Sequence, residues 1–455
     1  MVGRPRAIRK ANERLQAVME EAGCSNTGLA RRVNTCGAER GLDLHYDKTS
    51  VARWLQGQQP RGRVPAVIAE ALGRKLGHTV TVDDIGMNPV PGLGPTAGLR
   101  FEPTLSDALQ QVCALWRADA HRTGLSPTER PASSVLVQSS RDWLIADPDP
   151  TAVGSGDTAV SPKDIVTMRA ATVAFAELDH RFGSGHVRPA TVGHLNGTVS
   201  GLLRGLYGET TGRQLFGAAA RLTELAGYMA VDSNQFGLAQ RYYIQALRLA
   251  QAAGDRAFGG YVLASGMSHV ALVLGNPREA VQLARVAREG ARGWNGTSAE
   301  TVFYATEARG QALLGDAQAC KKAAEQAVEI SASADHDRDP DWAVHVDRAY
   351  LAEELARCYE DLNDYETATR WAQEALQGCP PRRARRRVLR LLLLASTLLK
   401  QGEIDRSHDT AAQAQEALPG LHSAQCNDAL DAYHGLLNAL GHSGGARELI
   451  APQRN

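Results

Sequence analysis

Apolar residues recur every three or four positions along most of this chain, the spacing that places them on one face of an α-helix. Residues 8–22 follow this pattern, and Gly23 is a typical stop after such a helix. A second helix is predicted directly afterwards, with Ser25 or Asn26 as its cap. The pattern therefore predicts that the chain begins with short helices packed against one another.

Residues 48–57 separate apolar from polar side chains most clearly. Val51, Trp54 and Leu55 lie on one side of the predicted helix, which must be buried against a small bundle. The opposite side is polar and basic, as in a helix that reaches base edges and phosphates of double-stranded DNA. The sequence therefore predicts a DNA-binding site, whose candidate residues are Asn26, Lys48, Thr49, Ser50 and Arg53.

A fourth helix is predicted from Pro65, and a short turn at residues 82–85 completes a domain that spans residues 1–86. A Ser-Asn-x-x-Leu-Ala helix, a Thr-Ser-x-x-x-Trp-Leu-x-Gly helix and a closing helix follow one another here. This order resembles the Cro/C1-type (XRE-like) helix-turn-helix family of bacterial regulators over residues 8–86. Residues 35–47 depart from that family, whose turn at this place is tight. They are either a loop lying along the DNA backbone or an extension of the second helix.

Charge is distributed unevenly along the chain. The whole sequence has 50 basic and 50 acidic residues, but residues 1–75 contain 14 lysines and arginines and only 7 acidic residues. A local positive excess is what binding to phosphates requires. Four basic residues precede the first helix, and we expect this arm to contact phosphates: Arg4, Arg6, Arg9 and Lys10. The alternative is a four-helix bundle that only contacts proteins and whose basic residues form a solvated face.

A segment rich in Pro and Gly follows the first domain. Residues 87–162 are predicted to be a linker that contains one helix, 104–122, capped by Thr104. Residues 125–162 are rich in Ser, Pro and Asp, and only two short apolar patches interrupt them. We therefore expect an irregular connection over these residues.

Small residues recur at intervals of about forty residues beyond residue 220. Five alanines occupy matching places: Ala246, Ala287, Ala327, Ala375 and Ala414. Seven residues before each stands another small residue, at spacings of 41, 40, 48 and 39 residues: Ala239, Ala280, Cys320, Ala368 and Ser407. Turns are predicted at Gly275, Gly315, Asn363 and Gly402. Helix pairs repeated in this way bury their faces by stacking on their neighbours.

The pattern resembles tetratricopeptide repeats over residues 220–420, in units longer than the ~34 residues of that family, with residues 423–440 as a cap helix. Together with the first domain it resembles a group of actinobacterial regulators that join a helix-turn-helix module to such repeats. The resemblance implies a transcription regulator, in some relatives one of sporulation and secondary metabolism. Residues 163–455 would then be a sensor and dimerisation domain.

Stacked helix pairs form a concave groove, and the first helix of each pair contributes to it. We expect this groove to hold a peptide or small-molecule effector. The candidate ligand-binding residues are Tyr228, Tyr261, His269, Tyr304 and Arg309.

The composition predicts an all-α fold: an N-terminal helix-turn-helix bundle and a C-terminal tetratricopeptide-like superhelix. Aromatic residues make up only 5% of the chain, which suits tightly packed helices. Seven isolated cysteines argue against a disulfide framework and a zinc site, and we expect neither a metal nor a cofactor. The longest apolar run is too short to cross a membrane and no signal peptide is recognisable, so a cytoplasmic protein without membrane contacts is predicted.

One cluster has residue types that occur in catalysis, Asp179-His180-Arg181 followed by Gly183 and His186. No nucleophile elbow, phosphate loop or metal motif accompanies it. We interpret it as a turn at the C-terminus of a helix, and an enzyme is not expected.

Six arginines fall within nine positions from Arg382 to Arg390. Such a run is either a second phosphate-binding patch or the solvated start of a helix. Positive charge at a helix N-terminus opposes the helix dipole, so acidic partners are required, from a neighbouring repeat or a second subunit.

These patterns together predict a sequence-specific DNA-binding transcription regulator that acts as a homodimer. The alternative is a tetratricopeptide-type scaffold for protein partners that has no regulatory role on DNA.

Overall fold

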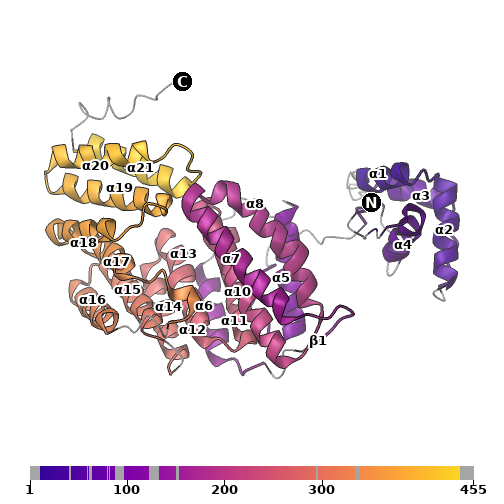
Figure 1. Cartoon of the computed structure of the whole chain (residues 1–455), viewed down its shortest axis with the longest axis horizontal. Coiled ribbons are helices and arrows are strands. Elements are labelled where there is room, and N and C mark those ends of the chain that lie inside the picture. Colours follow the sequence, from indigo (N-terminus) through magenta and orange to yellow (C-terminus); the bar gives the residue numbers. More distant parts are fainter. Residues whose placement is uncertain are drawn as a thin grey trace, which may run out of the picture. The chain divides into compact units, whose positions relative to one another are not determined.

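The computed structural model describes residues 11–39, 42–58, 60, 64–78, 80, 82, 84–87, 97–121, 133–149, 153–293, 296–333 and 339–440. These residues form an all-α protein (Figure 1). The strands among them are two short antiparallel segments, β1 (Gly154–Ser155) and β2 (Leu206–Tyr207). The chain divides into two compact units, residues 1–92 and residues 93–455.

The first unit contains four helices around one core. They are α1 (Glu13–Glu21), α2 (Asn26–Glu39), α3 (Lys48–Leu55) and α4 (Val64–Leu76). Helix α1 begins at Glu13 because the Asn12 side chain accepts a hydrogen bond from the Leu15 backbone N, at 3.0 Å. The Asn12 amide also donates to the Ile85 carbonyl oxygen at 2.9 Å, which ties the closing turn to the first helix.

The second unit begins with a group of helices that precedes the helix pairs. In chain order these are α5 (Leu105–Ala120), α6 (Ser133–Ile145), α7 (Pro162–Phe182), α8 (Ser184–His194), the π-helical η1 (Leu195–Val199) and α9 (Ser200–Leu203). Thr104 caps α5 through a bond from the Asp107 backbone N at 3.2 Å, as predicted.

Five helix pairs and a final helix make up the rest of the unit. The first helices of the pairs are α10 (Glu209–Asp232), the interrupted helix α12–η2–α13 (Arg256–Tyr261, Val262–Met267, Ser268–Val273), α15 (Thr297–Leu313), α17 (Arg348–Asp361) and α19 (Ala384–Lys400). The second helices are α11 (Phe236–Ala253), α14 (Pro277–Gly290), α16 (Ala317–Ala332), α18 (Tyr365–Gln377) and α20 (Ile404–Glu416). A short 3-10 helix, η4 (Asp341–Ala343), precedes α17, and α21 (Ala424–Ala439) ends the described chain.

The small residues of the predicted repeat all lie on the second helices of these pairs. Each of the ten, from Ala239 to Ala414, is completely buried. The facing helices contribute Gly227, Ala308, Ala356 and Ala395, and a Cβ at Gly227 would lie only 3.0 Å from the Tyr243 ring. Small side chains here therefore allow the paired helices to approach closely.

The turn inside each pair has one residue in the left-handed region of backbone conformation. Four of these residues are at predicted turns, Gly275, Gly315, Asn363 and Gly402, with φ between 61° and 84°. The fifth, Asn234 with φ of 56°, marks the turn between α10 and α11, which the sequence analysis did not single out. Glycine and asparagine are the residues that adopt this conformation at least cost.

The helix array closes on itself within the second unit (Figure 1). Helix α7 packs against α10 and α19, and α21 packs against α19 and α10. The His422 backbone N donates to the Phe182 carbonyl oxygen at 2.8 Å, and the Gly185 backbone N donates back to the His422 carbonyl oxygen at 3.0 Å. The end of the array is thus joined to its beginning.

Residues 87–162 do not form the linker that was predicted. Much of their described part belongs to the core of the second unit. Residues 133–145, expected to be irregular, form α6, and Trp143 is completely buried between Gly259 and Gly290.

Polar residues along α11 bind the adjoining backbone: Gln245 donates to the Gly98 carbonyl oxygen at 3.0 Å. Arg248 forms a bidentate ion pair with Asp149, with both N to O distances 2.8 Å. Side-chain bonds to irregular backbone leave no periodic signal in a sequence.

None of the described helices combines the length and hydropathy that crossing a bilayer requires.

Candidate functional site

Helix α3 is held in the first unit by its apolar side and its N-terminal cap. Val51 is completely buried and Trp54 is 3% exposed, with the Tyr46 ring edge-on at 4.9 Å between ring centres. Asp47 caps the helix, accepting hydrogen bonds from the Ser50 backbone N and hydroxyl, each at 2.8 Å. These bonds lower the pKa of Asp47, so the cap is ionised at neutral pH.

The outer side of α3 presents three of the predicted DNA-binding residues. Lys48, Thr49 and Arg53 are exposed, and the side chains of Lys48 and Arg53 have no hydrogen-bond or ion-pair partner among the described residues. A surface helix whose cations are not neutralised locally can bind phosphates and base edges.

The structure places Ser50 and Asn26 in other roles. The Ser50 hydroxyl is bonded to Asp47 in the cap, so it is already occupied within the helix. Asn26 is the first residue of α2 and is half-buried, while the preceding Ser25 accepts the hydrogen bond from the Gly28 backbone N at 3.2 Å. The four residues of the basic arm, Arg4, Arg6, Arg9 and Lys10, lie outside the described residues.

The unusual segment 35–47 extends the second helix and then returns to it. Helix α2 continues to Glu39. The Asn34 side chain then binds both the backbone N and the carbonyl oxygen of Tyr46, each at 2.9 Å. Of the two predicted alternatives, the helix extension is therefore present over residues 35–39, and the irregular segment before α3 is fixed to α2 at Tyr46.

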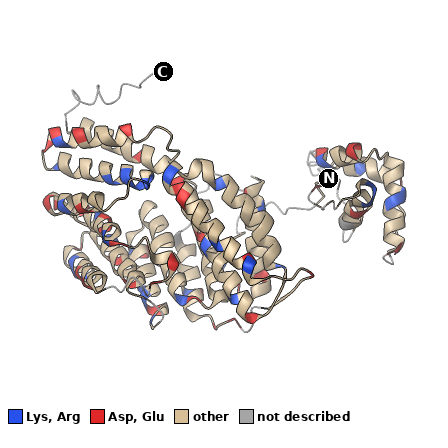
Figure 2. Ribbon diagram, viewed as in Figure 1, with Lys and Arg blue, Asp and Glu red and all other residues tan. Residues whose placement is uncertain are grey.

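Two further basic residues lie on the outer side of α2. Arg31 and Arg32 are exposed and their side chains have no partner among the described residues, and Figure 2 shows the basic residues on this helix. They were not among the predicted DNA-binding residues, although their place opposite the buried Leu29, Ala30 and Val33 in the helical pattern marks the outer face of α2.

Four of the predicted ligand-binding residues lie on one side of the repeat array, toward the first helices of the pairs. Tyr228 and Tyr261 are within electrostatic reach of each other, and so are His269 and Arg309. The His269 ring is exposed, yet desolvation, followed by the charges of Arg357 and Arg309, lowers its pKa to about 4. We call the surface formed by Tyr228, Tyr261, His269 and Arg309 the inner face.

Tyr304 does not lie with the inner-face residues. The Arg288 guanidinium of α14 lies over its ring, 4.7 Å from the ring centre, and Tyr304 packs at the edge of the core between α15 and α17. Instead the inner face includes His345, whose Nε2 lies 3.0 Å from the Tyr261 hydroxyl. Burial, followed by the nearby Arg386 and Arg383, lowers the pKa of His345 to about 4, so the ring is neutral.

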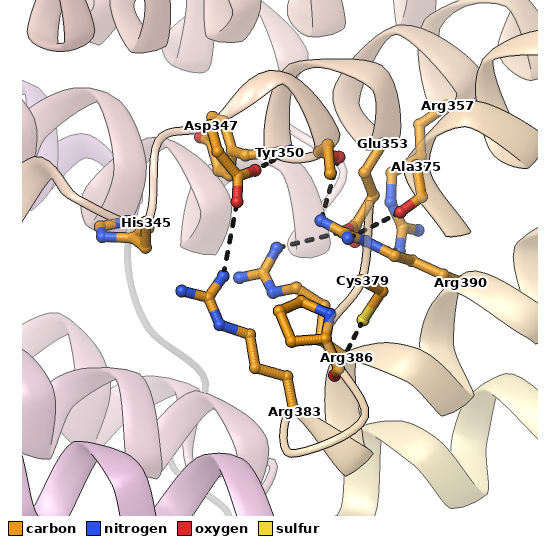
Figure 3. Close-up of polar contacts among 12 residues, drawn as sticks. His345, Asp347, Tyr350, Glu353, Arg357, Ala375, Cys379, Arg383, Arg386 and Arg390 are labelled. Atoms are coloured by element: carbon orange, nitrogen blue, oxygen red, sulfur yellow. Dashed lines mark hydrogen bonds and ion pairs between the residues drawn. The ribbon is translucent and has the colours of Figure 1, made fainter. Parts of the chain in front are cut away.

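The arginine run at the start of α19 has acidic partners within the same chain, on or just before the neighbouring helix α17 (Figure 3). Arg386 and Arg390 both bind Glu353 of α17, at 3.0 and 2.9 Å. Arg383 lies 3.9 Å from Asp347. Burial alone would raise the pKa of Glu353, but Arg386, Arg357 and Arg390 lower it well below its usual range.

Arg385, which like Arg390 is only 1% exposed, joins the two ends of the array. Its guanidinium binds Asp179 of α7 at 2.6 Å and lies 3.3 Å from Asp232 of α10. Ser184 donates to Asp179 at 2.6 Å, and Ser423, the cap of α21, donates to Asp232 at 2.5 Å. We call these five residues the closure cluster. Asp179, the acidic member of the apparent catalytic motif, is thus fully engaged in an ion pair.

The rest of that motif also fits a helix end. Gly183 has φ of 81° directly after α7, as the interpretation as a turn requires. Burial and the charge of Arg385 lower the pKa of His180 to about 3, which leaves its ring neutral. In the described part of the chain no three His, Cys, Asp or Glu side chains are grouped so as to hold a metal ion.

The described residues thus form a helical protein of two units, with exposed cations without partners on α3 in the first unit and the half-buried polar residues of the inner face in the second. A model of the SP15 N-terminal domain family matches residues 15–88, a segment that begins within α1 and includes α2, α3 and α4. No protein with a curated description matches the chain.

Proposed function

We propose that this protein is a sequence-specific DNA-binding transcription regulator of the cytoplasm. The first unit would read double-stranded DNA through α3, and the second unit would sense an effector. The observation that carries the proposal is the two-sided character of α3. Val51 and Trp54 fix the helix in the core, whereas Lys48 and Arg53 on the outer side are exposed and without partners.

The surroundings of α3 support this function. Arg31 and Arg32 add exposed positive charge on α2, and residues 1–75 have twice as many basic as acidic residues, 14 against 7. Phosphate contacts give affinity and orientation, and contacts to base edges give specificity. A helix-turn-helix module of the Cro/C1 type would use both.

A homodimer is part of the proposal, because one such module covers only a short DNA site. Two reading helices about one DNA turn apart (~34–36 Å) would bind the two halves of a palindromic operator. The tetratricopeptide-like second unit would hold the two copies together.

The inner face of the second unit is proposed as the effector site. Its half-buried polar residues come from helices far apart in the sequence, such as Tyr228 of α10 and Arg309 of α15. If the effector changes the affinity of the protein for DNA by some factor, DNA must change the affinity for the effector by the same factor.

The test is selection of DNA by the full-length protein from a random pool of duplexes, followed by sequencing. Enrichment of one motif, bound at least a thousandfold more tightly than a shuffled duplex at the same salt concentration, is expected for a regulator. Recovery of unrelated sequences would contradict this function and favour the alternative, a tetratricopeptide-type scaffold for proteins.

A further inference from the structure

One carboxyl on the inner face lies between two contacts that fix its position. On α10 the Arg221 guanidinium lies 5.8 Å from the centre of the Phe258 ring of α12. Gly227, two turns further along, faces the Tyr243 ring of α11. Glu224 lies midway between these contacts on the same side of α10, because residues three apart on a helix share a face. It therefore faces α11 and α12.

The Glu224 carboxyl is half-buried and makes no hydrogen bond or ion pair among the described residues. Tyr243 is only 1% exposed, and its hydroxyl likewise has no hydrogen-bond partner among them. Both groups are within electrostatic reach of each other. The oxygen atoms of both groups are still reached by solvent, so a ligand can bind them without breaking an existing hydrogen bond.

The cations of the inner face, in contrast, already have anionic partners. Arg386 binds Glu353, and Arg309 forms an ion pair with Asp361. Arg357 also binds Glu353, at 3.3 Å. An anionic ligand would have to displace a carboxylate from one of these arginines, whereas a cationic ligand at Glu224 displaces no side chain.

Two tyrosines lie within electrostatic reach of this carboxyl, Tyr243 of α11 and Tyr261 of α12. Tyr228, one turn further along α10, is not available to a ligand cation, because the Arg385 guanidinium lies over its ring, 4.7 Å from the ring centre. Tyr261 in turn lies 4.9 Å from the Trp342 ring and 5.9 Å from the Phe258 ring, between ring centres. Aromatic faces attract organic cations, and a carboxylate adds a direct ion pair.

We propose that Glu224, with Tyr243 and Tyr261, binds the ammonium group of a small organic amine, whose apolar part lies against Tyr261 and Trp342. The proposal deepens the effector role given above to the inner face and rests on it. It assigns the chemical class of the effector and the residue that recognises its charge.

Proton release follows from the same geometry. Burial raises the pKa of Glu224 to about 8. The titratable groups that face it from α11 and α12, Tyr243 and Tyr261, have raised pKa values and stay neutral. An ammonium ion requires the ionised carboxylate, so binding below pH 8 displaces a proton. The affinity should rise roughly tenfold per pH unit up to about pH 8.

The experiment is titration calorimetry of the full-length protein with phenethylamine at pH 6, 7 and 8, with phenylacetate as the anionic probe of the same shape. We expect phenethylamine to bind more tightly than phenylacetate and more tightly at higher pH. Glu224→Gln should weaken phenethylamine binding at pH 8 by at least tenfold and abolish its pH dependence. Tyr243→Phe, which removes only the hydroxyl, should weaken it severalfold.

Glu354→Gln is the matched control. Glu354 is another half-buried carboxyl without a hydrogen bond, but Arg357, Arg309 and Arg386 are within electrostatic reach of it. This variant should bind phenethylamine as the parent protein does. Equal affinity in the parent and Glu224→Gln, tighter binding of phenylacetate, or no binding of phenethylamine at millimolar concentration would overturn the proposal. The titration contains no DNA, so failure to bind DNA would count against the proposed function alone.

Discussion

Basic side chains are used in opposite ways in the two units. On the first unit Lys48 and Arg53 of α3 are exposed and have no partner in the described structure. On the second unit Arg385 and Arg390, each 1% exposed, bind carboxylates of neighbouring helices. The chain as a whole has equal numbers of acidic and basic residues, so its net charge conceals this difference.

This difference in burial distinguishes arginines and lysines that can serve binding from arginines that serve stability. A solvated cation contributes little to folding but is available to a phosphate or a base. A buried cation is held by its carboxylates, and loss of either partner leaves an uncompensated charge in a medium of low polarity. Substitution of an arginine should therefore affect DNA binding in the first unit and folding in the second.

The largest effect is expected at Arg385. Arg385→Met keeps the bulk of the side chain but leaves Asp179 and Asp232 buried together without a cation. The free energy of unfolding of the second unit should fall by ~3–5 kcal/mol. Urea denaturation followed by circular dichroism measures the loss. Exposed Arg382, three residues earlier, is the control, and Arg382→Met should change the stability by less than about 0.5 kcal/mol. Equal stability of the two variants would show that the closure cluster is unimportant.

Deletion of residues 1–10 should have the next largest effect, on DNA affinity alone. If Arg4, Arg6, Arg9 and Lys10 each contact a phosphate, the slope of log affinity against log salt should decrease by about 0.9 per contact. The preference for the selected motif over a shuffled duplex should remain, because phosphate contacts carry no sequence information. Binding measured by fluorescence anisotropy over a range of salt concentrations gives both quantities. An unchanged slope would exclude the arm from the interface.

A smaller effect, on stability, is expected at Glu224. The folded protein raises the pKa of this carboxyl from 4.5 to about 8, so its stabilising contribution is complete below pH 4.5 and is lost as the pH rises through 8. Glu224→Gln should therefore be no more stable than the parent near pH 4.5 and more stable by ~1 kcal/mol near pH 8, allowing for partial solvation. Thermal unfolding at the two pH values tests this, and a gain of the same size at both would contradict it.

An effect of similar size is expected at Asp47, the cap of α3. Asp47→Ala removes the acceptor for the Ser50 backbone N and should destabilise the first unit by ~1 kcal/mol. Asp43→Ala, a change to an exposed carboxylate before the helix, is the control. Comparable hydrogen-exchange rates of the α3 amides in the two variants would show that the cap contributes little.

The helix pairs could be predicted because their signals are local and periodic. Small residues at Ala280 and Ala287 recur with the repeat, and a left-handed turn selects Gly or Asn, as at Gly315 and Asn363. The two faces of α3 were visible for the same reason, since Val51 and Trp54 fall on one side of a helical wheel. The cap residue Asp47 is a local signal too, but its bond to Ser50 was not taken into account.

Contacts between distant segments could not be predicted in this way. The arginine run predicted that acidic partners exist, but nothing in the sequence identifies Asp179 and Glu353 as those partners. Helix α6 was missed because its flanks are rich in Ser and Pro, while the bonds that hold its neighbourhood come from Arg248 of α11. Glu224 was overlooked because a lack of partners becomes visible only in three dimensions.

The central claim is that the outer side of α3 reads DNA, and its most direct test is the affinity of α3 variants for the selected motif. Lys48→Ala and Arg53→Ala should each weaken binding by ~1–3 kcal/mol while the protein stays folded. Arg406→Ala, a change to an exposed arginine paired with Glu403 on the second unit, should bind as the parent does. If both α3 variants bind the motif with the parent affinity at the same salt concentration, α3 is not the reading helix.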